Sequence, residues 1–390
     1  MFNKLFTAWL QLKYQKIRLI LALSGVIFAV VIVFMQLGIR DALFDSAVRF
    51  HKSLDGDCFI ISPRSTSLIA MENFPNRRLA QALAFEEVDH VSPIYLDFAQ
   101  WKNPESRKYW RNIFVIGFDL RDQVFTLPGV NENRQKLQLP DTILFDRSSR
   151  TEFGPIAQQF TTYGKAKTEI GSNSGSNRRV DVVGLFDLGT SFGSDGNIIT
   201  SEVNFLRLVD TRAKGRIDVG LIKLTPGTDP NQFKQKLVQK LPRDIKILTK
   251  QEFIQFEKKY WQSSTAIGFI FNLGVFLGLI VGVVVVYQIL YTNVSDHLPQ
   301  YATLKAIGYT QNYLLSIVFQ QALFIGALGY LPGLIISIIQ YQFAAKMTLL
   351  PIIMTWQRAV FVLVTTLIMC LISGFSAMNK LKSANPADVF

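Results

Sequence analysis

The sequence alternates between long apolar stretches and segments of mixed polarity. Four of the apolar stretches are long enough to cross the roughly 30 Å hydrocarbon core of a bilayer as helices. They predict transmembrane helices at residues 19–40, 263–290, 314–345 and 359–378. The third contains Pro332, which favours a tilt or a kink. The pattern therefore predicts an α-helical membrane protein with one span, a large α+β domain of two lobes, and three further spans.

The residues between the first two spans, 41–262, carry the shorter periodicities of an α+β domain. A strand, a helix and a strand are predicted at 57–62, 77–85 and 90–98, and again at 217–224, 230–241 and 244–248. These two distant units predict one membrane-proximal α+β lobe, built from 41–114 and 216–262. The strand-rich residues 115–215 predict a distal β-rich lobe, in which GSNSGSN at 171–177 is typical of a flexible hairpin tip.

The remaining segments are short, and their charges predict the orientation. Residues 1–18 suit an amphipathic helix on the membrane surface, with a plain basic flank as the alternative. We expect 19–40 to be retained as an anchor rather than cleaved as a signal peptide. Lys and Arg are expected to accumulate in cytoplasmic loops. With both termini inside, the cytoplasmic side holds Lys4, Lys13, Lys16, Arg18, Lys305, Lys380 and Lys382, against Arg40, Lys346 and Arg358 outside.

This orientation assigns each connecting segment to a side of the bacterial inner membrane. The domain 41–262 and the short loop 346–358 would be periplasmic. The loop 291–313 and the tail 379–390 would be cytoplasmic.

The net charge of +12 at pH 7 suggests a nucleic-acid ligand until the charges are placed along the chain. Residues 41–262 hold 31 Lys and Arg against 27 Asp and Glu, so this domain is nearly balanced. The excess flanks the apolar stretches, where it serves orientation and contact with anionic lipid. We therefore expect membrane lipid, and no nucleic acid, as a partner.

The motifs of common enzymes are missing or incomplete. The sequence has no GxxxxGK[ST] loop for ATP and no HExxH zinc motif, and we expect no metal site and no bound cofactor. Gly189–Gly193 fits GxSxG, but SDGN follows it rather than a helix, and no histidine of the outer domain lies downstream of Ser191. The uncharged runs at the centre of the spans, 19–37, 267–290, 314–343 and 359–378, lack Asp, Glu, Lys, Arg and His, which argues against an ion-coupled carrier.

Two features within the membrane part favour helix packing and a partner. Gly274, Gly278 and Gly282 recur every four residues, a small-residue stripe on which another helix can pack closely, within the chain or between two copies. The cytoplasmic loop contains QYATLKAIGY at 300–309, a short apolar helix with Gly308 suited to its end.

A short apolar helix facing the cytosol needs a partner, unless it is a connector resting on lipid. The three-residue spacing of Tyr301, Leu304 and Ile307 predicts one shared face for that partner, with Lys305 beside it.

Several of these segments resemble one family. QYATLKAIGY is similar to the coupling helix of FtsX-type ABC permeases, which usually have Glu where Gln300 stands. EEVDHVSPI at 86–94 and RVDVVGLFDLGTSFGSDGNIITSE at 179–202 are similar to motifs of the MacB periplasmic domain. LKSANPADVF at 381–390 resembles the family's C-terminal tail. TSFGSDGN and YATLKAIGY look most like the DevC-type permeases of cyanobacteria, which export glycolipid.

The resemblance implies a homodimeric permease without catalytic residues, driven by a separate ABC ATPase subunit that binds the ATP. It implies contact with that ATPase through Gln300, Tyr301, Leu304, Lys305, Ile307 and Gly308. A periplasmic adaptor and a TolC-like outer-membrane channel would complete the exporter of a lipid, a glycolipid or a similar cargo. Two alternatives share the fold: lipoprotein extraction of the LolC kind, and activation of a cell-wall hydrolase as by FtsX.

Overall fold

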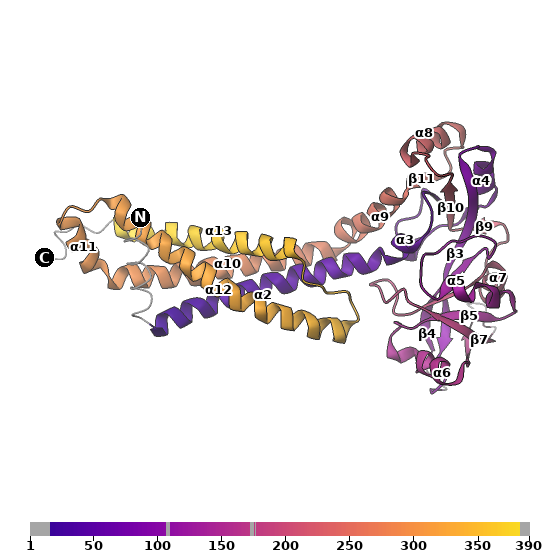
Figure 1. The fold of residues 1–390 in the computed structure, drawn as a ribbon, viewed down its shortest axis with the longest axis horizontal. Coiled ribbons are helices and arrows are strands. Elements are labelled where there is room, and N and C mark those ends of the chain that lie inside the picture. Colours follow the sequence, from indigo (N-terminus) through magenta and orange to yellow (C-terminus); the bar gives the residue numbers. More distant parts are fainter. Residues whose placement is uncertain (1–15, 107–109, 172–174, 176, 383–390) are drawn as a thin grey trace. The chain divides into compact units, whose positions relative to one another are not determined.

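The computed structural model describes residues 16–106, 110–171, 175 and 177–382. The predicted N-terminal surface helix and the C-terminal tail fall largely outside these residues. The chain forms two compact units (Figure 1). We call them the helical unit (Met1–Ala42, Ala266–Thr348 and Ile352–Phe390) and the sheet domain (Leu43–Thr265 with Leu349–Pro351).

Four long helices, α2, α10, α12 and α13, are apolar and long enough to cross a membrane. The helices of the helical unit are α2 (Lys16–Ala47), α10 (Ala266–Asp296), α11 (Leu298–Ala306), α12 (Gln311–Thr348) and α13 (Trp356–Lys382). The long helices run side by side, and α12 continues through Pro332 (Figure 1).

The helix ends differ from the predicted span ends. The first span was predicted to end at residue 40, but α2 continues to Ala47 because Ala42, Leu43 and Phe44 give the helix a buried face beyond the apolar stretch. The second was predicted to begin at 263, but the extended backbone of Thr265 (φ −121°, ψ 157°) delays α10 until Ala266.

The sheet domain is built on one nine-stranded sheet of order β11-β1-β10-β3-β4-β8-β5-β7-β6. The strands are β1 (Cys58–Ile61), β3 (Val88–Lys102), β4 (Trp110–Phe118), β5 (Thr142–Asp146), β6 (Ala166–Gly171), β7 (Asn177–Phe186), β8 (Asn197–Ser201), β10 (Val219–Leu224) and β11 (Lys246–Thr249). β2 (Phe74–Pro75) pairs with β9 (Arg216–Ile217). The β4–β8 and β5–β7 pairs are parallel and the others antiparallel.

Short helices flank this sheet. They are α3 (Arg49–Ser53), α4 (Arg77–Ala80), α5 (Val130–Asn133), α6 (Ile156–Tyr163), α7 (Glu202–Leu208), α8 (Pro230–Lys240) and α9 (Lys250–Lys259), which continues as a π-helical turn at Tyr260–Ser264. The start of α8 follows the turn signal in the sequence, because Asp229 caps the backbone N–H of Asn231 and Pro230 occupies the first turn.

The two predicted lobes share the strand β3. Strands from the two segments of the membrane-proximal lobe do pair, since β1 lies between β10 and β11. The 15-residue β3 then continues into the other half, where Gln100 and Trp101 also pair with Gly171 and Ile170 of β6. This last pairing closes β3, β4, β8, β5, β7 and β6 into a ring. The halves are therefore not separate compact units, because one strand is common to both.

A buried histidine and a buried glutamate face each other where α3 packs on α9. His51 Nε2 lies 3.7 Å from Glu257 Oε2, beyond hydrogen-bond distance, and both side chains are almost inaccessible. Glu257 instead accepts hydrogen bonds from the backbone N–H of Leu68 and the indole N–H of Trp261, each 2.7 Å long. Burial lowers the pKa of His51 to about 3 and raises the pKa of Glu257 to about 7.

These two pKa shifts make the stability of the fold depend on pH in opposite directions. The variant His51→Leu removes the histidine contribution and leaves that of Glu257. Below pH 6.5 the unfolded chain protonates His51 and the folded chain does not, so acid destabilises the fold by up to about 1.4 kcal/mol per pH unit. Between pH 7 and 4.5 the folded chain protonates Glu257 first, so acid stabilises it. We expect the stability of His51→Leu relative to the wild type to increase as pH falls from 6.5 towards 4.

Thermal unfolding of the detergent-solubilised full chain across this pH range measures the difference. A constant offset between variant and wild type would contradict the prediction.

Candidate functional site

The short helix α11 connects α10 to α12 and contains most of the predicted coupling residues. Pro299 stands in its first turn, where a missing backbone N–H has no cost. Gly308 ends it with φ +103°, a left-handed conformation that favours glycine. The N–H of Tyr309 donates to the carbonyl of Leu304 at 3.1 Å, which closes the last turn. The local sequence therefore fixes both ends of this helix.

One side of α11 is buried inside the helical unit. Tyr301 is 3% exposed and packs with Val294 of α10 and with Leu314 and Val318 of α12, while the partly buried Leu304 packs against the same cluster. Burial raises the pKa of the Tyr301 hydroxyl to about 12, so it is neutral at any physiological pH. This contact holds α11 against the ends of both neighbouring helices.

The other side of α11 is exposed. It presents Gln300, Thr303 and Ile307, of which Ile307 is 71% exposed. The prediction that Tyr301, Leu304 and Ile307 share one outward face is wrong. Each three-residue step turns a helix by about 300°, so two steps leave Tyr301 and Ile307 roughly 120° apart. Lys305 lies between the two sides and is half-buried.

The glycine stripe of α10 is covered by helices of the same chain. A Cβ on Gly274 would meet the side chain of Gln36, and one on Gly278 would lie 3.0 Å from Ile32 Cγ2, both in α2. At Gly282 the added atom would clash with the sulfur of Met369 in α13 and lie 2.9 Å from Ala29 Cβ. The stripe thus lets α2 and α13 approach the α10 backbone within one chain.

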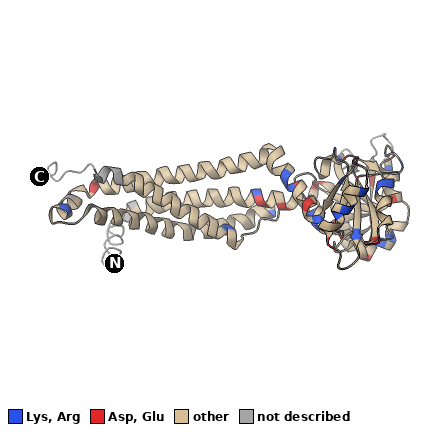
Figure 2. Cartoon of the chain, turned by 90° about the horizontal axis from the view of Figure 1, so that it is seen from above, with Lys and Arg blue, Asp and Glu red and all other residues tan. Residues whose placement is uncertain are grey.

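An ionic network at the opposite end from α11 joins all four long helices, and the sequence interpretation missed it. Asp41 of α2 accepts from Arg358 of α13 and from the adjacent Arg40, each at 2.9 Å. Arg40 also donates to Asn272 of α10 at 2.9 Å, and Arg358 lies 5.7 Å from the ring centre of Tyr341 in α12. Charged residues are otherwise confined to the ends of these helices (Figure 2). The only signal in the sequence was that both arginines flank predicted spans.

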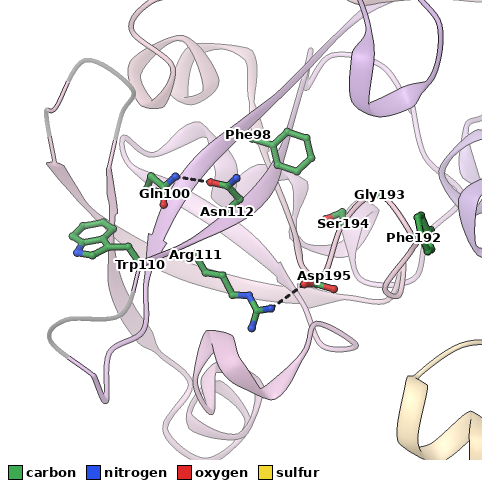
Figure 3. A pocket seen from close by; sticks show the side chains of 9 residues that line it. All are labelled: Phe98, Gln100, Trp110, Arg111, Asn112, Phe192, Gly193, Ser194 and Asp195. Carbon is green, nitrogen blue, oxygen red and sulfur yellow. Dashed lines mark hydrogen bonds and ion pairs between the residues drawn. The ribbon is translucent and has the colours of Figure 1, made fainter.

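A depression of about 540 Å³ in the sheet domain lies over β3 and β4 (Figure 3). Its charged groups are already paired, because Arg111 contacts Asp195 at 3.1 Å and Glu152 at 3.2 Å. It is lined by Phe98, Gln100, Trp110, Arg111, Asn112, Phe192, Gly193, Ser194 and Asp195. This combination offers aromatic and amide surface for binding but no nucleophile beside a base.

The GxSxG match does not form a nucleophile elbow. Ser191 lies in the loop between β7 and β8, and its Oγ accepts from the N–H groups of Gly193 and Ser194 at 3.2 and 3.1 Å. A strand rather than a helix follows this loop. Among the residues that the structure describes, no group of three His, Cys, Asp or Glu side chains could hold a metal ion.

Two protein families match different parts of the sequence. The family of the MacB-like periplasmic core domain matches residues 19–240, more than half of the chain. The family of the FtsX-like permease C-terminal region matches residues 272–386. No curated protein matches the sequence.

Two solved structures are similar to part of the chain. The periplasmic region of MacB from Actinobacillus actinomycetemcomitans has 11% identity and a TM-score of 0.34, over 52% of this chain and 92% of that one. The extracellular domain of the noncanonic ABC-type transporter YknZ from Gram-positive bacteria has 10% identity and a TM-score of 0.29, over 50% of this chain and 100% of that one.

The glycine contacts predict that a larger side chain destabilises the helical unit at Gly282 but not at an exposed position of the same helix. Gly282→Leu should lower the stability of the helical unit by about 1–3 kcal/mol, because Met369 and Ala29 leave no room for a side chain. Val284→Leu is the matched control, because Val284 lies on the same helix and is 57% exposed. Thermal unfolding in detergent compares the two. Equal melting temperatures for the two variants would show that the close approach at Gly282 is unimportant.

Proposed function

The chain belongs to the ABC transporter permeases that combine a MacB-like periplasmic core domain with an FtsX-like C-terminal region, and we propose that it is the permease subunit of a MacB-like exporter. Its four apolar helices and its periplasmic domain fit a protein of the inner membrane. In the proposal, ATP is hydrolysed by a separate subunit, and this chain carries the resulting motion to the periplasm.

The two-sided packing of α11 is the observation that supports this function. Its exposed side, with Gln300, Thr303 and Ile307, is free to contact an ATPase. Its buried side is packed against α10 and α12, and close-packed side chains transmit a displacement rather than absorb it. Since α10 is continuous from Asp296 back to Ala266, a movement of α11 is passed along the helix to the residue that directly follows the sheet domain in the chain.

The further partners of the proposal follow from the family resemblance. Two copies of the chain would bind two ATPase subunits, a periplasmic adaptor and a TolC-like channel. TSFGSDGN at 190–197 and YATLKAIGY at 301–309 favour the DevC type, and hence a glycolipid or a related lipid as cargo. The absence of charged side chains from the central, apolar part of each predicted span agrees with a machine whose cargo does not cross the bilayer through this subunit.

Copurification of the wild-type chain from its native membrane tests the assignment. An adaptor and an outer-membrane channel should accompany the ATPase. Recovery of a cell-wall hydrolase instead would favour the FtsX-type role.

The orientation of the chain can be measured with single cysteines. We propose that both termini and α11 are cytoplasmic and that the sheet domain is periplasmic. The exposed positions Val203 and Thr303 report on the two sides, and the native Cys58 and Cys370 are buried and should not react. Val203→Cys should react with a membrane-impermeant maleimide in intact spheroplasts, and Thr303→Cys only after lysis. The reverse pattern would overturn the orientation.

The exposed side of α11 should be required for ATPase binding. Ile307→Asp replaces a 71% exposed apolar side chain with a charge, so the permease should fold normally. If Ile307 is an anchor of the interface, losing it costs about 2 kcal/mol, or roughly thirtyfold in affinity for the ATPase. Val203→Asp, an equally exposed apolar position on α7, is the control and should bind the ATPase normally.

The variant Leu304→Asp provides the contrasting case. Its carboxylate would enter the cluster of Tyr301, Leu314 and Val318, so we expect the helical unit itself to be destabilised. Full ATPase recovery with Ile307→Asp, at normal thermal stability, would refute the role of this face.

A further inference from the structure

The loop between β7 and β8 has a fixed shape, although it has no regular secondary structure. The buried carboxylate of Asp146 accepts from the backbone N–H groups of Leu188 at 3.3 Å and Gly189 at 2.9 Å. The side chain of Asn197 donates to the same carboxylate at 2.8 Å. Gly189 has φ +88°, which favours glycine, and the Ser191 hydroxyl closes the following turn. The loop is therefore held at both of its ends and in the middle.

This rigid loop exposes an aromatic side chain. Phe192 is 52% exposed, and its ring packs edge-on against Trp261, with ring centres 5.1 Å apart. Figure 3 shows Phe192 at the opposite end of the depression from Trp110. Ile69, 38% exposed, packs over Gly193, where a Cβ would lie only 2.6 Å from Ile69 Cγ2. We call Ile69 and Phe192, supported by Trp261, the Phe192 patch.

The patch is attached near both ends of the main segment of the sheet domain, Leu43–Thr265, where this segment joins a span. The guanidinium of Arg49, two residues after the end of α2, donates to the carbonyl of Leu188 at 3.3 Å. The carboxylate of Glu257 holds the N–H of Leu68 and the indole of Trp261 together. Trp261 itself precedes the first residue of α10, Ala266, by five positions in the sequence.

Chain length alone therefore limits how far the patch can be from the bilayer. Five residues extend over at most about 18 Å, and over much less where they are helical, as at Tyr260–Ser264. The residues just before the span, Lys258, Lys259 and Tyr260, combine basic and aromatic side chains as interfacial anchors do. Such residues are typical of the headgroup layer, where aromatic rings with one polar edge are most stable.

We propose that the Phe192 patch inserts into the headgroup region of the lipid leaflet that faces the sheet domain. An exposed Phe and Ile on a rigid support lose contact with water there, and the free energy gained grows with the apolar area buried. A second copy of this chain is the competing occupant of the patch. The short chain segments that join Arg49 and Trp261 to the spans favour lipid, because their length limits how far the patch can lie from the ends of the spans.

Lipid quenching of a fluorophore tests this proposal on the purified full chain, without any partner subunit. Phe192→Cys is labelled with nitrobenzoxadiazole, and Cys58 and Cys370 stay unlabelled because both are fully buried. The protein is reconstituted in phosphatidylcholine nanodiscs with or without lipid that carries a doxyl group near the headgroup. Tyr163→Cys, at a 72% exposed aromatic position on α6, is the control.

We expect doxyl lipid to reduce the emission at position 192 to roughly half, as for insertion by about 5–10 Å, and to leave position 163 unchanged. Ile69→Cys should behave like position 192, which keeps the test valid if one variant folds poorly. Equal and weak quenching at positions 69, 192 and 163 would overturn the proposal. So would excimer emission from pyrene at position 192, which would identify a second copy as the occupant.

Discussion

Close backbone approach at glycine is the interaction on which the helical unit depends. Inside a bilayer the lipid is as apolar as the side chains, so helices associate through packing rather than through exclusion of water. Gly278 and Gly282 bring α10 against α2 and α13, and Gly329 and Gly333 of α12 pack on valines of α2. At each of these glycines, atoms of a neighbouring helix occupy the space that a side chain would fill. The ionic network around Asp41 and the anchored α11 then secure the two ends of a bundle that these contacts create.

The sequence predicted the features that depend on composition over long windows. The four spans, the domain between them and the strands of the membrane-proximal half all follow from runs of apolar residues and their periodicity. The face of α11 was misassigned because a three-residue spacing does not keep residues aligned over two turns. The end of α2 was placed seven residues early, because the helix continues as an amphipathic rather than an apolar segment.

Other features depended on pairings that no local pattern records. The contact between Gln100 and Gly171 closes the ring of strands, and the pair of Asp41 and Arg358 joins residues 317 positions apart. The residues that flank each partner in the sequence do not indicate the pairing. Membrane orientation already explains a charged residue beside a span, so nothing in the sequence pairs Asp41 with Arg358. Only the fold shows that the same cation also connects one helix to another.

The position of β1 in the sheet has a consequence for how the protein is made. Its four residues pair only with β10 and β11 in the nine-stranded sheet, and β11 ends at Thr249. At synthesis rates of roughly 5–20 residues per second, β1 waits about 10–40 s for both neighbours. During that interval the thiol of Cys58 and three apolar side chains are accessible to oxidants and to other nascent chains. Biogenesis of this subunit therefore favours a chaperone or a reductant on the side of the membrane where the sheet domain folds.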